Sequence, residues 1–113
     1  MKFTRLLDYS EEYIYRGMVL RCVGKWPYED IVEFLVCEPI DEGRGFVLMV
    51  ATGYKAGLIN VRLPQECIPP GNVRGLSTLW LKENWSTWGY TDCPIDKVYI
   101  YTPVIPKTLN VLS

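Results

Sequence analysis

Short runs of β-branched, aromatic and other apolar residues, separated by Gly and Pro, recur through the first 63 residues. This pattern is typical of strands joined by turns. The runs cover residues 13–23, 31–38, 46–52 and 59–63. The segments between the runs are short, whereas a parallel crossover needs about ten residues or more, so we expect an antiparallel meander.

The runs differ in how their two faces should be buried. In the second run Val32, Phe34 and Val36 lie on one face, and Glu33 is among the residues of the other face. The third run, residues 46–52, is apolar throughout, as expected of a central strand buried on both faces. In the fourth run apolar and polar residues alternate, so we expect Ile59, Val61 and Leu63 to point inward.

Residues 77–88 change to a helical period. At about 100° per residue, Leu81, Trp85 and Trp88 fall on one side of a helix, and we expect this side to pack on the sheet. The sequence therefore predicts one helix of about eleven residues, with the Trp side chains contributing to the core.

The ends of this segment carry helix-terminating signals. Ser77 or Thr78 can accept a hydrogen bond from a free amide of the first turn. Gly89 occupies the position at which many helices end in a left-handed residue. The alternative is a strand over residues 76–82, because Leu79 points away from the apolar side of the helix.

The remaining segments complete a mainly β (α+β) fold. Residues 64–75 hold three Pro and two Gly and predict a loop, whereas residues 96–102 alternate as a strand does. Residues 104–112 offer one further short edge strand. We expect a single domain over residues 1–113, since domains usually span about 100–200 residues. Its predicted architecture is a curled antiparallel sheet or a partly closed barrel of about five or six strands, with the helix packed on it.

The composition excludes several function classes. The chain has no His, which removes Ser–His and Cys–His catalytic pairs and His-containing metal sites. Its 13 acids and 12 bases give a net charge of −1, so overall charge does not favour nucleic acid. No apolar run of about 7–15 residues follows the N-terminal bases, and none approaches the ~18 of a membrane span. We expect a cytoplasmic protein that does not enter the membrane.

The nucleophiles and acids form no recognisable catalytic site. The four cysteines have no C-x-x-C spacing and are expected to be free thiols rather than metal ligands, although an exported protein could pair them: Cys22, Cys37, Cys67 and Cys93. Cys93 lies in a turn and is the one we expect to be exposed. It has no visible base to lower its pKa, and no cofactor motif is present. We therefore expect neither an enzyme nor a cofactor.

Acidic residues concentrate near the N-terminus. Residues 1–42 hold nine acids and five bases, a net charge of −4. Three adjacent pairs fall at predicted turns or strand ends, where side chains can contact a partner, and they are Glu11, Glu12, Glu29, Asp30, Asp41 and Glu42. These six residues are our candidate partner-binding residues, for a basic protein partner. The alternative is that they only keep the protein soluble.

A second alternative is a small β module that binds single-stranded nucleic acid. Such modules stack bases on aromatic side chains beside a basic groove. The residues that could form this groove are Tyr54, Lys55, Arg62 and Arg74. The near-zero net charge disfavours this interpretation.

The tryptophan-rich segment carries a family resemblance. The sequence WLKENWSTWGY at residues 80–90, with GLS at 75–77, Asp92-Cys93 and VYI at 98–100, resembles small bacterial immunity proteins of polymorphic and contact-dependent growth inhibition toxin systems. It is most similar to immunity protein family 45. The resemblance implies a cytoplasmic, non-enzymatic protein that binds and neutralises one cognate toxin domain, which is often a nuclease. The Trp residues of the family resemble scaffold, so no functional residue is transferred from them.

Overall fold

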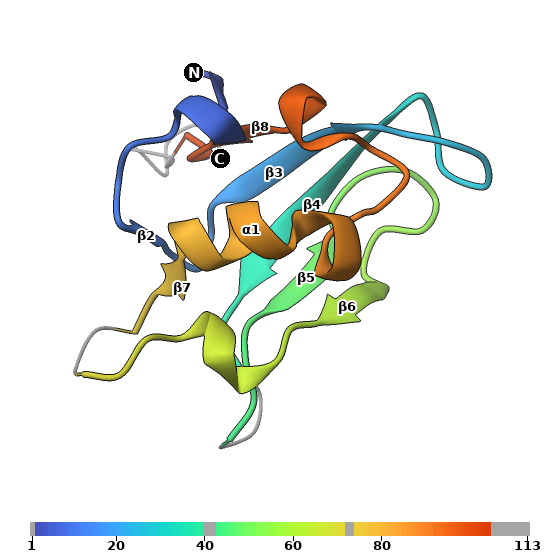
Figure 1. Cartoon of the computed structure of the whole chain (residues 1–113). Helices are drawn as coiled ribbons and strands as arrows, with labels where there is room; N and C mark the ends of the chain where they lie inside the picture. Colours follow the sequence, from blue (N-terminus) through green and yellow to red (C-terminus); the bar gives the residue numbers. More distant parts are fainter. Residues whose placement is uncertain (1, 40–42, 72–73, 105–113) are drawn as a thin grey trace, which may run out of the picture.

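The computed structural model describes residues 2–39, 43–71 and 74–104, and Figure 1 shows their arrangement. Within these residues the elements are β1 (Thr4–Arg5), β2 (Tyr13–Ile14), β3 (Val19–Val23), β4 (Ile31–Cys37), β5 (Val47–Val50), β6 (Ile59–Arg62), β7 (Leu76–Ser77), α1 (Thr78–Trp88) and β8 (Tyr99–Tyr101). Three short 3-10 helices lie between them, over Leu6–Asp8, Gln65–Cys67 and Ile95–Lys97.

Six strands form one antiparallel sheet in the order β1-β8-β3-β4-β5-β6. The predicted meander is confirmed as β3 to β6, and β8 joins it on the free side of β3. The register places one row of apolar side chains across the sheet: Ile100 beside Leu20, Leu20 beside Phe34, and Phe34 beside Val50. These residues are at most 2% exposed, so the row forms the centre of the core. The sheet is curled and not closed into a barrel.

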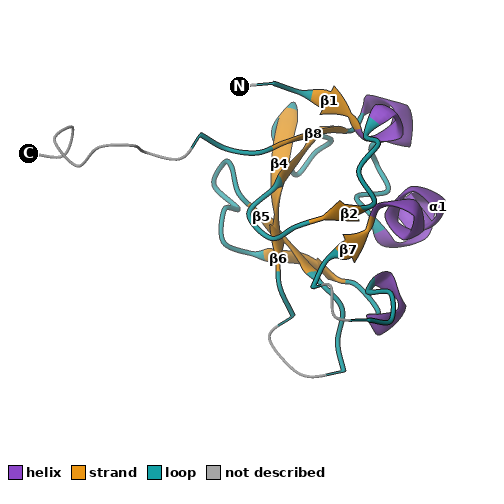
Figure 2. Cartoon of the chain, turned by 90° about the vertical axis from the view of Figure 1, so that its left-hand side faces the viewer, coloured by secondary structure: helices purple, strands orange, loops and turns teal. Residues whose placement is uncertain are grey.

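A second, two-stranded sheet pairs β2 with β7. The sequence predicts one strand run over residues 13–23, but Gly17 divides it into β2 and β3. Gly17 has a φ of 87°, which L side chains rarely adopt, and its N–H donates to Val36 O at 2.8 Å. β7 leads directly into α1, and Figure 2 shows both on one side of the large sheet.

The predicted helix and its apolar side are confirmed. Ser77 caps α1, because its Oγ accepts a hydrogen bond from Trp80 N at 3.1 Å. Leu81 and Trp85 are buried in the core, and Trp88 packs against it while remaining half-buried. The Trp85 indole N–H donates to Cys93 O at 2.8 Å, which satisfies a polar atom that burial would otherwise leave unpaired.

Gly89 follows the last residue of α1 as predicted, but the left-handed conformation predicted for it is wrong. Gly89 is extended, with φ −82° and ψ −159°, and is not left-handed. A Cβ at this position would lie against the ring of Trp85. The glycine therefore provides space for an aromatic ring, not backbone freedom.

The predicted inward position of Ile59 is also wrong. Leu48 pairs with Val61, but Met49 pairs with Ile59, so Asn60 is an extra residue in a β-bulge. A single inserted residue reverses the side-chain alternation. Ile59 therefore lies on the same face as Met49 and is 38% exposed.

Other parts of the chain agree with the predictions to differing degrees. The third run contains the central strand β5, which is buried except at the half-buried Met49, whereas Ala51 at the end of the run is exposed. Residues 96–102 contain β8. Residues 64–75 are not wholly irregular, since the 3-10 helix Gln65–Cys67 inserts the buried Cys67. β1 was not predicted. Most of the possible edge strand over residues 104–112 lies outside the described residues.

Candidate partner-binding surfaces

The structure separates the acid pairs that the sequence singles out. Glu11 and Glu12 are exposed in the segment before β2. Glu29 and Asp30 lie in the β3–β4 connection, where Asp30 is exposed and Glu29 is half-buried. In Figure 1 these two positions are at opposite ends of the molecule. The third pair lies outside the described residues and comprises Asp41 and Glu42.

Glu11 and Glu12 border a hollow of about 390 Å³ at the start of α1. Its walls come from residues 9–13 and 77–79, together with Pro69 and Lys82. The hydroxyl Oγ1 of Thr78 is buried in this region and has no hydrogen-bond partner among the described residues. The hollow combines two exposed carboxylates with a partly apolar wall, which is a setting that a basic protein side chain would fit.

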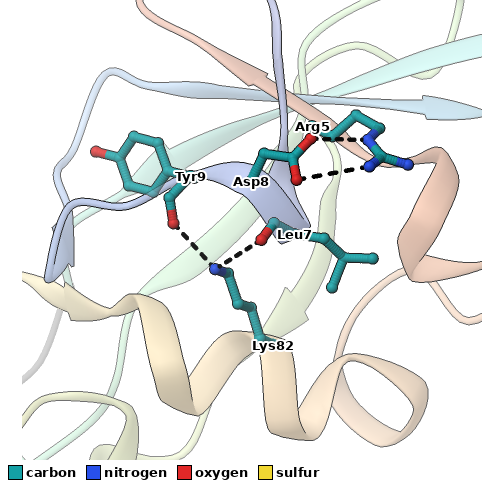
Figure 3. Close-up of polar contacts among 5 residues, drawn as sticks. All are labelled: Arg5, Leu7, Asp8, Tyr9 and Lys82. Carbon is teal, nitrogen blue, oxygen red and sulfur yellow. Dashed lines mark hydrogen bonds and ion pairs between the residues drawn. The ribbon is translucent and has the colours of Figure 1, made fainter.

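Lys82 lines the same hollow and connects α1 to the N-terminal segment. Figure 3 shows its ammonium group donating to two backbone carbonyls, Leu7 O at 3.2 Å and Tyr9 O at 2.9 Å. Nearby, Arg5 pairs with Asp8 at 2.9 Å. The sequence places Lys82 on the helix side opposite Leu81 and Trp85. The structure shows that this lysine ties the 3-10 helix Leu6–Asp8 to α1.

Glu29 has a structural function that the sequence did not reveal. Its Oε1 accepts a hydrogen bond from Tyr54 N at 3.2 Å, and its Oε2 is buried without a partner among the described residues. The carboxylate occupies the space where a Cβ of Gly53 would lie, and Gly53 also has a φ of 77°. Glu29 therefore joins the β3–β4 and β5–β6 connections, and only its neighbour Asp30 is freely exposed.

The same two connections present two large aromatic side chains to solvent. Trp26 is 88% exposed and Tyr54 is 74% exposed. The Tyr54 hydroxyl donates to Pro27 O at 2.9 Å, so the two connections are linked a second time. The sequence predicts residues 24–28 only as a break between two strands. A Trp directly before Pro27, in a turn that begins at Gly24, is the signal that could have marked this surface.

A buried carboxylate lies on the face of the sheet opposite α1. Glu33 is 7% exposed and accepts hydrogen bonds from Arg21 Nε at 2.7 Å and from the Tyr101 hydroxyl at 2.8 Å. Burial, together with the hydrogen bond to Glu33, raises the pKa of Tyr101 to about 12. The sequence placed Glu33 opposite Phe34 but did not predict its burial. Both carboxylate oxygens are hydrogen-bonded, so this cluster links β3, β4 and β8 on this face of the sheet.

All four cysteines are free thiols, and the prediction of an exposed Cys93 is wrong. Cys93 is 1% exposed because the turn that contains it folds beneath α1, where its carbonyl accepts the Trp85 hydrogen bond. A hydrogen bond with Cys93 and burial raise the pKa of the Cys22 thiol.

Within the described part of the chain, no three His, Cys, Asp or Glu side chains are grouped as metal ligands. No described helix is long and apolar enough to cross a membrane.

The residues considered for nucleic-acid binding do not form one groove. Tyr54 and Lys55 are adjacent, with the Lys55 ammonium 5.6 Å from the centre of the Tyr54 ring. Arg62 is exposed on the edge strand β6. Arg74 precedes β7 in the chain and forms an ion pair with Glu38 at 3.1 Å, and Figure 1 shows β7 well away from β6.

The structure defines a small, mainly β protein with one six-stranded sheet, one two-stranded sheet and one α-helix among the described residues. The model of the family Immunity protein 45 matches residues 6–100. The chain therefore belongs to the immunity protein 45 family, which indicates a function in toxin neutralisation. Immunity proteins are generally non-enzymatic. No curated protein and no solved structure matches the chain.

Proposed function

We propose that this protein neutralises one cognate toxin domain in the cytoplasm by binding it stoichiometrically, without a chemical reaction. The family match over residues 6–100 is the observation that carries this proposal. The structure supports it because the described groups best suited to catalysis serve the fold. Glu33 is fully hydrogen-bonded, and Cys22, Cys67 and Cys93 are buried.

The proposed partner is a basic toxin domain, such as a nuclease with a cationic site for its substrate. Exposed carboxylates attract such a surface and accelerate association, whereas they repel nucleic acid. The candidate contact residues remain the six acids Glu11, Glu12, Glu29, Asp30, Asp41 and Glu42. Because the first two pairs lie at opposite ends of the molecule, one small toxin domain is expected to contact only one of them.

The proposal is tested first by genetics. Each reading frame adjacent to the gene for this chain is induced in a bacterial host, alone and together with the chain. We expect one neighbour to stop growth when induced alone and to form a complex of fixed stoichiometry with this protein, which restores growth. If no toxic neighbour is rescued, the proposed function is wrong.

Charge reversal then tests the acidic contacts. The double variant Glu11→Lys/Glu12→Lys is compared with Asp30→Lys, which avoids disturbing the hydrogen bond of Glu29 to Tyr54 N. Exposed substitutions of this kind typically change stability by less than about 0.5 kcal/mol each. The variant that faces the toxin should associate more slowly than the parent, and the difference should shrink as salt is added.

Two outcomes of this comparison contradict the proposal in different ways. If both variants and a Lys variant of Asp41 and Glu42 associate at the parent rate, acidic contacts do not steer the toxin. If the parent binds a single-stranded oligonucleotide tightly and does not bind the toxin domain, the nucleic-acid module is the better interpretation.

A further inference from the structure

Trp26 carries the most exposed large hydrophobic side chain among the described residues. It lies in the connection between β3 and β4, and 88% of its surface is exposed. Among the described residues, its indole N–H donates no hydrogen bond and no ring packs on it. Single exposed apolar residues are common, but a Trp ring offers about 150–250 Å² that gains free energy on burial.

The backbone that carries Trp26 is held firmly in place. Lys25 N donates to the Tyr90 hydroxyl at 2.9 Å, and that hydroxyl donates back to Lys25 O at 3.4 Å. Gly24 N donates to Asp30 O at 2.7 Å, which closes the connection. The ring of Tyr28 packs edge-on against Tyr90 with 5.3 Å between the ring centres. An exposed ring on a fixed base loses little conformational entropy when a partner covers it.

Further exposed apolar side chains lie in the same connection and beside it. Tyr54 is 74% exposed and is tied to Pro27 O. Val23 and Ile31 face each other at the base of the connection and are 49% and 54% exposed. We call Val23, Trp26, Ile31 and Tyr54 the tip surface. Figure 1 shows this connection projecting at the end of the sheet farthest from β2 and β7.

We infer that the tip surface is the docking site for the toxin domain. In the complex, the side chain of Trp26 inserts into a pocket of the toxin domain. This inference rests on the proposed function. The residues that provide most of the energy of a protein interface are enriched in Trp and Tyr, and polar residues surround them. Here the flanking exposed residues Lys25 and Asp30 carry opposite charges.

The opposite charges of Lys25 and Asp30 indicate what kind of partner this surface binds. A polyanion or an anionic membrane is recognised by a surface of one positive sign. The exposed carboxylate of Asp30 opposes both, whereas a folded protein domain can match charges of both signs around an apolar pocket. The occupant is therefore a toxin domain with an apolar pocket for the indole and a mixed-charge rim.

The test measures binding to the neighbour-encoded toxin domain, purified as an inactive variant. Trp26→Ala should weaken the equilibrium Kd at least about 30-fold, mainly through faster dissociation. Trp26→Phe should lie between this variant and the parent. Val104→Ala is the matched control, because Val104 is also exposed, at 68%, and lies outside both the tip surface and the hollow. Its Kd should stay within about threefold of the parent. Leu79→Ala reports on the hollow instead, because Leu79 lines it.

Two further measurements show whether a loss of binding reflects misfolding and whether Trp26 is covered in the complex. Trp26→Ala, Leu79→Ala and Val104→Ala should melt like the parent, since all three side chains are exposed. In the complex, the fluorescence contributed by Trp26, taken as parent minus Trp26→Phe, should become protected from acrylamide.

The outcomes distinguish the docking site from the proposed function. If the parent binds the toxin domain and Trp26→Ala binds equally well, the docking inference is wrong while the proposed function stands. Weakened binding by Leu79→Ala or Glu11→Lys/Glu12→Lys, with Trp26→Ala unaffected, moves the docking site to the hollow. If the parent itself does not bind, both are wrong.

Discussion

Gly89→Ala tests whether the end of α1 is limited by space or by backbone conformation. The observed φ of −82° is open to alanine, so the substitution adds no backbone strain. Alanine also reduces the conformational entropy of the unfolded chain, which stabilises the fold by about 0.4–1 kcal/mol. Against this, the new methyl group meets the ring of Trp85, which is 2% exposed and cannot move outward freely.

The steric effect should dominate. Overpacking a core by one methyl group costs about 1–3 kcal/mol. Subtracting the entropic gain, we expect Gly89→Ala to lower the free energy of unfolding by about 1–2 kcal/mol. This loss is measurable against the ~5–15 kcal/mol of a typical domain. A left-handed glycine would also be sensitive to this substitution, so the single variant does not separate the two reasons.

A double-mutant cycle separates them. In a Trp85→Leu background the six-membered ring is absent, and Gly89→Ala should become neutral or stabilising by up to about 1 kcal/mol. The coupling between the two sites should therefore be about 1–3 kcal/mol. Urea unfolding of the four proteins gives each value, provided that the m values agree. An equal cost of Gly89→Ala in both backgrounds would refute the steric explanation.

Two further predictions concern the core and the buried carboxylate. Trp85→Ala should cost about 3–5 kcal/mol in urea unfolding and Trp88→Ala less, because only Trp85 is buried; equal costs would contradict this assignment. For Tyr101, the raised pKa means that the folded state keeps the phenol proton to a higher pH than the unfolded chain does. Stability from this group should be complete below pH 10.0 and be lost as the pH rises through about 12, by up to about 2–3 kcal/mol. Tyr101→Phe should remove this part of the decline in melting temperature between pH 9 and 12. If the variant and the parent show the same dependence of melting temperature on pH, the contribution assigned to Tyr101 is wrong.

The features that sequence predicted well depend on local signals. The alternation at Val32, Phe34 and Val36 is sufficient to define a strand with one buried face, and all three residues are buried. Ser77 predicts the start of the helix because a capping hydrogen bond is local: its hydroxyl accepts from the amide of Trp80, three residues later. Such patterns need no knowledge of which segments meet.

The features that were missed depend on pairs of residues far apart in the chain. The reversal at Ile59 depends on how β6 aligns with β5, and residues 59–63 alternate regularly in the sequence. The hydrogen bond of Glu29 to Tyr54 N joins two turns that are each polar and unremarkable alone. Cys93 is buried because α1 covers it, which a turn sequence cannot indicate.

The same limit applies to charge. The net −4 of residues 1–42 does not become one acidic face, because Glu38 pairs with Arg74 from a later segment and Glu33 is buried beside Arg21. Asp8 is exposed but pairs with Arg5, and the other exposed acids among the described residues of this segment, Glu11, Glu12 and Asp30, lie at two distant positions. A field spread in this way steers a partner weakly, and raising the salt should slow association only a few-fold. The lifetime of the complex should then depend on contacts that exclude water, and Trp26 is the side chain best placed to supply them. A complex whose dissociation rate rises steeply with salt would contradict this division between steering charges and an aromatic anchor.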